Sequence, residues 1–265
     1  MTGWAILKHS LRMMLANYGF VIFMSLLFSV ALPASSFCVD WLKSAKFLPT
    51  WVQLASAFLL LDVLCLGIVL LLVSYVAVRW HRRIILGNTK RSWNPFRHGR
   101  LVLMYWWKLL GLSVLYIAFF VPFLFVYIQL LVGQSGGMLQ IEMNSVFFLS
   151  ILTGIWGCLA LFIPLRLSPI LVAAALDEDM RVKEAWLATR GSSRAIFDLL
   201  FWAFLVWAAL FGLGGLMAFG ATGVGLFTGI AILVGVLLFV GFEIMAAIAI
   251  ITTIYDHFVE GLDLA

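Results

Sequence analysis

The sequence predicts an all-α integral membrane protein, a polytopic bundle of about six transmembrane helices that forms a single domain over residues 1–265. The first observation is composition: 65% of the residues are apolar and only 11% are charged, whereas a soluble domain carries about 25% charged residues. A soluble fold of this length could not hide so much apolar surface from water. The other two observations are the recurrence of long apolar runs and the clustering of Lys and Arg between them.

The apolar runs predict the membrane spans. A helix that crosses the hydrocarbon core needs about 20 apolar residues. Six runs reach this length, at residues 18–38, 53–78, 107–132, 146–165, 198–219 and 228–254. Helices are expected because an isolated helix satisfies its own backbone hydrogen bonds in lipid.

The segment Trp4–Ala16 precedes the first span and predicts an amphipathic helix. Its apolar side chains share one stripe at helical spacing: Trp4, Leu7, Leu11 and Met14. Its polar side chains fall elsewhere on the helix: Lys8, His9 and Arg12. We therefore expect an N-terminal interfacial helix that lies on the inner leaflet.

The Lys and Arg residues predict the orientation. All but two of the 17 lie before span 1, between spans 2 and 3, or between spans 4 and 5, and the two exceptions are Lys43 and Lys46. The side of the membrane that carries the excess of Lys and Arg is the cytoplasmic side. An even number of spans then puts both termini in the cytoplasm, and we expect a multi-pass protein of a bacterial inner (plasma) membrane.

The loop between spans 2 and 3 is uniformly cationic, because no acidic residue occurs between Val63 and Ile141. Each Lys or Arg near an anionic leaflet contributes about 1 kcal/mol of attraction. The charges could only fix the orientation, could recognise a lipid headgroup or phosphate, or could bind a protein partner. The candidate residues for lipid or partner binding in this loop are Trp80, His81, Arg82 and Arg83.

The loop between spans 4 and 5 carries mixed charge and predicts a short helix. Acidic residues at its start and Arg190 at its end suit the helix dipole. Gly191 can end the helix in the left-handed conformation. We expect both cytoplasmic loops to carry short interfacial helices. The candidate residues for lipid or partner binding in this loop are Arg166, Trp186, Arg190 and Gly191.

Two carboxylates lie inside apolar runs, Asp62 in the second and Glu243 in the sixth. An ionisable group at the centre of a membrane helix costs about 2.5–3.5 kcal/mol on insertion scales, so each is a candidate functional residue. They could be protonated packing residues, could serve transport of a proton or cation, or could lie closer to an interface.

Signatures of catalysis are absent from the sequence. It contains no Walker A, GxSxG or HExxH motif, and no histidine has a carboxylate or cysteine at metal-ligand spacing. We therefore expect no enzyme activity, no metal and no cofactor. No zinc, helix-turn-helix or RNA-binding signature indicates a nucleic-acid partner, whereas the net charge of +5 favours anionic lipid.

Two segments carry a resemblance to a known family. Residues 80–87, WHRRIILG, resemble the WHR…LLGE segment of small inner-membrane proteins of alphaproteobacteria whose function is unassigned. RLSPIL at 166–171 and AWLATRG at 185–191 resemble the RLSLILPA…EAWxxTRG pattern of the same proteins. The general plan is also similar to YciC-like proteins and to the membrane domain of some glycerophosphodiester phosphodiesterases. The resemblance implies a six-span fold and an inner-membrane location, and it supplies no activity.

Together these features predict a non-enzymatic factor for membrane homeostasis or assembly, or an accessory protein. It would act at the cytoplasmic leaflet on anionic membrane lipids, with a protein partner as a further possibility. The alternative is a small transporter or carrier that uses Asp62 and Glu243.

Overall fold

The computed structural model describes the backbone of residues 2–44, 55–87, 98–134, 143–220 and 226–262. The side chains it describes are those of residues 2–31, 63–87, 98–123, 125, 151–206, 208, 235 and 238–262. All long elements in these ranges are helices, as the sequence predicts. They are α1 (Gly3–Ala16), α2 (Tyr18–Ser44), α3 (Ala55–Ile85), α4 (Gly99–Gln134), α5 (Met143–Leu167), α6 (Pro169–Leu176), α7 (Val182–Ala188), the 3-10 turn η2 (Arg190–Ser192), α8 (Ser193–Gly220) and α9 (Leu226–Phe258).

Three described segments are long and apolar enough to cross a membrane: Val63–Ile85, Gly99–Phe123 and Leu238–Phe258. Two bent pairs of helices also qualify if each pair forms one span, so the described residues contain three to five candidate spans. Large apolar side chains are exposed along these helices, for example Ile68, Val114 and Phe125. Extensive exposed apolar surface is rare on soluble monomers, and the fold is consistent with a membrane protein.

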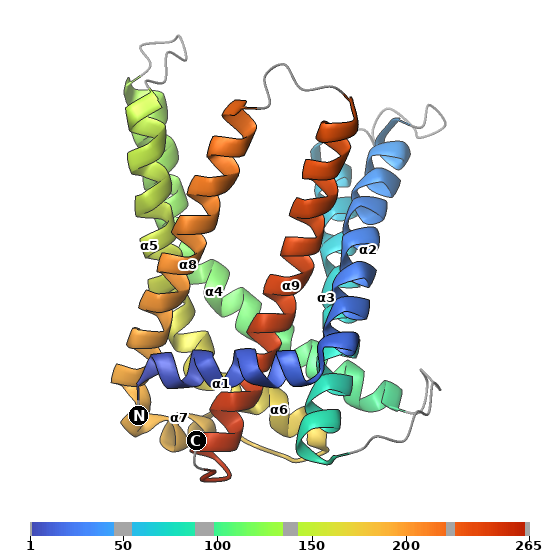
Figure 1. Ribbon diagram of the computed structural model, residues 1–265, viewed down its shortest axis with the longest axis vertical. Helices are drawn as coiled ribbons and strands as arrows, with labels where there is room; N and C mark the ends of the chain where they lie inside the picture. The colour runs from blue at the N-terminus through green and yellow to red at the C-terminus, as the bar shows by residue number, and fades with distance from the viewer. Residues whose placement is uncertain (1, 45–54, 88–97, 135–142, 221–225, 263–265) are drawn as a thin grey trace.

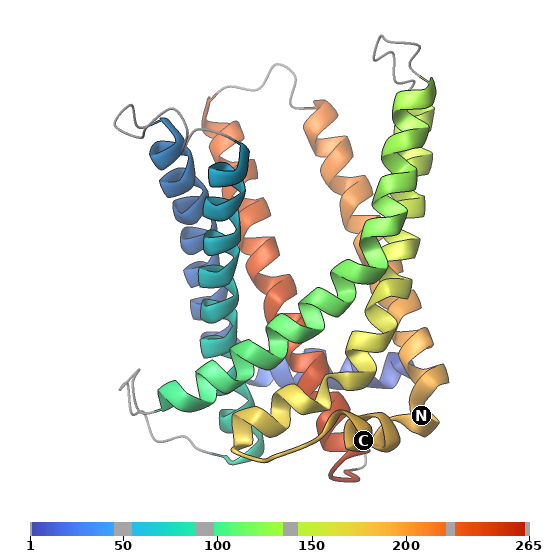
Figure 2. The ribbon, with the colours of Figure 1, turned by 180° about the vertical axis from the view of Figure 1, so that it is seen from behind.

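The long helices form two groups (Figure 1). In one group α2, α3 and α9 run side by side, and in the other α5 and α8 pack together. Figure 2 shows α4 crossing diagonally from the first group to the second. At one end of the molecule, here called the α1 end, α1, α6 and α7 lie across the bundle, and α9 ends there too.

The predicted N-terminal helix exists, and the side that it buries differs from its apolar stripe. The buried residues of α1 are Gly3, Ile6, Ser10 and Met14, whereas Trp4 is 49% exposed. The reason is size, because small side chains let α1 approach α8 and α9 closely. A Cβ atom at Gly3, for instance, would collide with the backbone of Leu199. Within the predicted apolar stripe, Met14 is buried, Leu7 is partly buried against Ile6 and its neighbours, and Trp4 and Leu11 are exposed.

The second predicted loop contains the expected short helices, but α6 is not interfacial. All residues of α6 except Leu176 are buried, and the helix packs against α3, α4 and α9. Pro169 fits the first turn of α6, because a backbone N–H at that position would have no acceptor within the helix. The helix ends at Asp177, which has the left-handed conformation with φ 69°. The exposed short helix is α7. Residues 88–97 of the first predicted loop lie outside the described residues.

Candidate functional site

Polar side chains gather inside the α1 end, around Thr252 of α9. The indole Nε1 of Trp80 donates to the Thr252 hydroxyl at 3.0 Å, and Nδ1 of His81 lies 2.9 Å from the same oxygen. The Thr252 hydroxyl donates in turn to the carbonyl of Ile248 at 2.9 Å. Trp80, His81 and Thr252 are fully buried. Two residues of the predicted binding motif therefore connect α3 to α9 inside the protein.

These hydrogen bonds fix the tautomer of His81. A hydroxyl has one proton, and Thr252 gives it to Ile248, so Nδ1 of His81 must donate to Thr252. In the neutral ring Nε2 is then an acceptor, and the hydroxyl of Tyr105 on α4 lies 3.3 Å from it. His81 of α3 thus contacts α9 and α4 through a neutral ring in which both nitrogens have a hydrogen-bond partner.

Two neighbours of Thr252 on α9 make similar connections. The hydroxyls of Thr253 and Ser10 are 2.9 Å apart, which links α9 to α1. The Tyr255 hydroxyl donates to Oε2 of Glu178, just after α6, at 2.6 Å. We refer to Thr252, Thr253 and Tyr255 as the α9 polar cluster. Within one turn this cluster reaches α1, α3 and the segment after α6.

The two arginines of the first motif are placed differently. Arg82 donates to the carbonyl of Ala175 in α6 at 3.1 Å. Arg83 is exposed, and its Nε donates to Oδ1 of Asn17 at 3.2 Å. Asn17 is the residue between α1 and α2, at a bend of 92° that we refer to as the elbow. Arg83 therefore keeps its charge at the surface beside the elbow.

The second motif is assembled around a buried arginine. Arg166 at the end of α5 donates to the carbonyl of Thr189 at 3.2 Å, and its guanidinium lies 3.8 Å from the ring centre of Trp186. The Thr189 hydroxyl lies 3.1 Å from the carbonyl oxygen of Arg166 and 2.9 Å from that of Ala185. Trp186, Arg190 and Gly191 are exposed to different degrees. Arg166 thus holds α7 against α5, and the motif leaves Arg190 and Gly191 at the surface.

The first turn of α1 is held by a carboxylate from another helix. Oδ2 of Asp198 on α8 accepts from the backbone N–H of Gly3 at 2.6 Å and of Trp4 at 3.4 Å. These N–H groups have no partner within their own helix, and a negative charge there also suits the helix dipole. Asp198 therefore anchors α1 to the bundle.

Replacing Asp198 by alanine is expected to loosen α1. The two N–H groups lose their acceptor, which costs about 1 kcal/mol, as for a lost N-cap. The measurement is the rate at which a membrane-impermeant thiol reagent modifies a cysteine introduced by Ile6→Cys. This rate should be higher in the Asp198→Ala background than in the parent. Asp198→Asn keeps an acceptor oxygen and should react at an intermediate rate. Equal rates in all three backgrounds would show that Asp198 does not hold α1.

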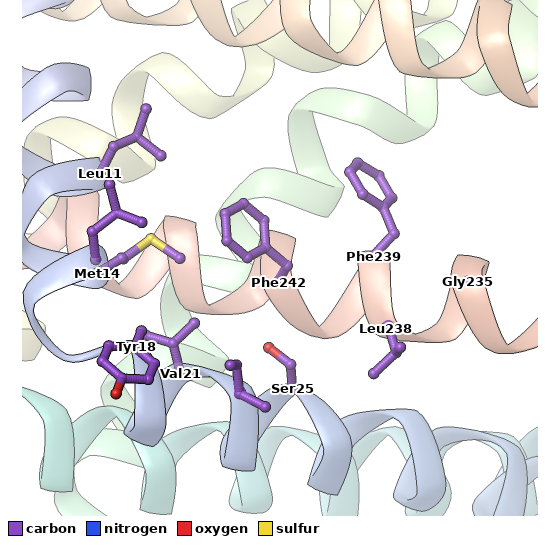
Figure 3. A pocket seen from close by; sticks show the side chains of 11 residues that line it. Leu11, Met14, Tyr18, Val21, Ser25, Gly235, Leu238, Phe239 and Phe242 are labelled. Atoms are coloured by element: carbon purple, nitrogen blue, oxygen red, sulfur yellow. The ribbon is translucent and has the colours of Figure 1, made fainter.

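A cavity of about 640 Å³ lies in the angle between α1 and α2, with α9 as its third wall. Its lining is apolar except for Tyr18 and Ser25, and Figure 3 shows the side chains that surround it. From α1 and α2 come Leu11, Met14, Leu15, Tyr18, Val21, Ile22 and Ser25, and from α9 come Gly235, Leu238, Phe239 and Phe242. Leu15, Tyr18 and Ile22 are exposed, so the cavity opens on the outer surface.

Ser25 and Gly241 set the distance between two walls of this cavity. A Cβ atom at Gly241 would lie 2.6 Å from the carbonyl oxygen of Ser25, so α2 and α9 touch backbone to backbone. At Gly235, two turns earlier in α9, an added Cβ would meet no atom within 4 Å. Gly235 lines the cavity together with Leu238, Phe239 and Phe242, whereas Gly241 faces Ser25, so the cavity lies beside this close contact.

The structure describes one of the two predicted intramembrane carboxylates. Glu243 is exposed on α9, directly after the cavity residue Phe242. Asp62 is part of α3, and its side chain lies outside the described residues. Among the side chains that the structure describes, no group of three or more His, Cys, Asp and Glu could hold a metal ion.

Comparison with known proteins places this chain in no family. No protein-family model, no curated protein and no solved structure matches it.

The α9 polar cluster and the cavity are not among the sites that the sequence predicts. A signal for the first was present, because Thr252 and Thr253 form a polar pair within the otherwise apolar stretch 244–254. The cavity had no local signal, since its walls come from three helices that meet only in the folded chain.

Proposed function

We propose that this chain is a non-enzymatic inner-membrane factor that binds anionic phospholipid at the cytoplasmic leaflet and serves membrane homeostasis or assembly. The observation that carries this proposal is the surface of the α1 end. Arg12 on α1 and Arg83 beside the elbow are exposed there, next to a cavity that opens toward the bilayer. Cations at headgroup depth next to an apolar opening suit an anionic lipid.

The inward placement of the motif residues supports a binding role rather than a catalytic one. Trp80 and His81 bond their ring nitrogens to side chains of other helices, and Arg166 donates to the carbonyls of Trp186 and Thr189. The exposed members of the predicted set are Arg83, Trp186, Arg190 and Gly191. We propose that the buried residues hold the cytoplasmic end rigid and that the exposed ones face lipid headgroups or a partner.

The proposal includes six spans with both termini in the cytoplasm of a bacterium. In this arrangement α8, an apolar helix of 28 residues, is the fifth span and α9 is the sixth. Arg166 at the end of α5 and Arg82 and Arg83 at the end of α3 belong to the α1 end. The positive-inside rule assigns such an end to the cytoplasm.

The test compares lipid compositions. The protein is extracted with its surrounding lipid in polymer-bounded nanodiscs, and their lipid is compared with that of the whole membrane. We expect anionic phospholipid to be enriched around the parent protein and less enriched around the Arg12→Ala/Arg83→Ala variant. The matched control is Arg181→Ala/Lys183→Ala, which removes two exposed charges at α7 and should keep the enrichment.

Nanodiscs with the composition of the bulk membrane would contradict the proposal. So would equal enrichment around both double variants and the parent, because the charges beside the elbow would then play no part.

The alternative function, a small carrier, rests on Glu243, an ionisable side chain that is exposed within the candidate span Leu238–Phe258. A carrier of protons or cations should lose flux in proteoliposomes when Glu243→Gln or Asp62→Asn is introduced. The lipid-binding function predicts that neither substitution changes the anionic enrichment in nanodiscs.

A further inference from the structure

We propose that the cavity between α1, α2 and α9 is a binding site for one acyl chain of an anionic inner-leaflet phospholipid, with its phosphate held by Lys8 and Arg12. This inference rests on the proposed function and gives it a specific site.

The size and lining of the cavity suit an acyl chain. Its volume of about 640 Å³ is that of an ordinary ligand pocket, about 300–1,000 Å³. Leucine, phenylalanine, valine and methionine side chains form most of the wall. A void within hydrocarbon loses the dispersion contacts of the atoms that line it. A flexible hydrocarbon chain restores those contacts without any directional requirement.

The cavity opens on the outer surface of the bundle beside α1. Leu15 is 72% exposed and Tyr18 is 68% exposed at its opening, beside the elbow. The 92° bend lays α1 across the base of α2, at the depth of an interfacial helix. A lipid of the same leaflet could therefore place its headgroup beside α1 and pass a chain over α1 into the cavity.

Two cations lie on α1 where that headgroup would be. Leu11 and Leu15 line the cavity, and each follows a cation by three residues: Lys8 before Leu11 and Arg12 before Leu15. Residues three apart are neighbours on a helix surface. The two cations are themselves four residues apart, so they form one stripe beside the cavity stripe. This arrangement suits a single phosphate group at the rim.

Ser25 gives an independent sign of a ligand. It is 5% exposed, and its hydroxyl has no hydrogen-bond partner. Ser74 and Thr252, by contrast, donate to the carbonyl one turn earlier, and Ser10 and Thr253 have each other's hydroxyl as a partner. In Figure 3 the Ser25 oxygen points into the cavity, toward Phe242. An unpaired buried hydroxyl is costly, and an oxygen of a bound lipid, such as an ester carbonyl, would accept its proton.

The test uses Gly235→Phe, which fills the cavity from α9. An added Cβ at Gly235 meets no atom within 4 Å, so the phenyl ring enters the cavity without displacing the backbone. Gly111→Phe is the matched control, because Gly111 is also exposed and equally free of contacts, but it lies on α4 away from the cavity. Purified proteins are titrated with phosphatidylglycerol or phosphatidylcholine and examined by native mass spectrometry, with melting temperatures measured in parallel.

We expect the parent and Gly111→Phe to bind one phosphatidylglycerol in preference to phosphatidylcholine, and Gly235→Phe to lose this adduct at an unchanged melting temperature. Lys8→Ala/Arg12→Ala should still bind but lose the preference for the anionic headgroup, by roughly five-fold for each cation removed. Occupancy by a second copy of the chain would appear as a dimer that Gly235→Phe disrupts, and it would overturn the inference.

An adduct that Gly235→Phe leaves intact would also overturn the inference, and so would equal binding of the two lipids by the parent. If Gly235→Phe keeps its anionic enrichment in nanodiscs, the cavity is not the site, but the proposed function survives. If the parent shows no enrichment, the proposed function itself fails.

Discussion

Replacing Gly241 by leucine is expected to cost the protein about 3 kcal/mol of stability, as severe overpacking does. The first added atom would lie 2.6 Å from the carbonyl oxygen and 2.8 Å from the Cα of Ser25. Both are backbone atoms, so no side chain can rotate to make room. The helices α2 and α9 would have to move apart, and the cavity beside them would change shape. A lower melting temperature in detergent measures this effect.

Gly235→Leu is the matched control for Gly241→Leu. It makes the same change in the same helix, at a position where an added Cβ meets no atom within 4 Å. We expect its melting temperature to stay close to that of the parent. Equal destabilisation by the two substitutions would mean that helix propensity, rather than the contact with Ser25, explains the loss.

Replacing Thr252 by valine is expected to have a comparable effect. Valine has nearly the same shape but lacks the hydroxyl, so the indole N–H of Trp80 and the ring N–H of His81 lose their acceptor. Each unsatisfied buried donor costs about 1–3 kcal/mol, which gives about 3 kcal/mol for the pair. Denaturant or thermal unfolding followed by tryptophan fluorescence or circular dichroism would measure it.

Thr252→Ser separates the hydroxyl from the methyl group. Serine keeps the acceptor and loses one buried methyl, so we expect it to retain most of the stability that Thr252→Val loses. If serine and valine destabilise the protein equally, packing of the methyl group matters more than the hydrogen bonds of the α9 polar cluster.

The helices were predictable from the sequence because composition alone indicates them. An apolar run that is long enough to cross a bilayer forms a helix, because a helix satisfies its own backbone hydrogen bonds in lipid. The N-terminal helix was also predictable, but its buried face was not. The apolar stripe does not reveal that face, because the close contact uses Gly3 and Ser10, whose small size matters more than hydrophobicity when helices pack in lipid.

The candidate site was predictable only in part, because charge and sequence position do not reveal whether a side chain points into the protein or to its surface. Arg82 and Arg83 are adjacent, yet one donates to the backbone of α6 and the other remains at the surface beside the elbow. Arg166 was predicted as a binding residue from its motif, and the structure places it among the carbonyls of Trp186 and Thr189. Which arginine side chain turns inward depends on partners that lie 20 or more residues away in the sequence.

Photochemical cross-linking with an anionic phospholipid that carries a diazirine on its acyl chain tests the central claim most directly. We predict that the cross-links concentrate in peptides containing residues 11–25 and 235–242, and that Gly235→Phe removes them. Cross-links spread evenly over exposed apolar residues elsewhere, such as Phe119, Val121 and Phe125 of α4, would contradict a lipid site between α1, α2 and α9.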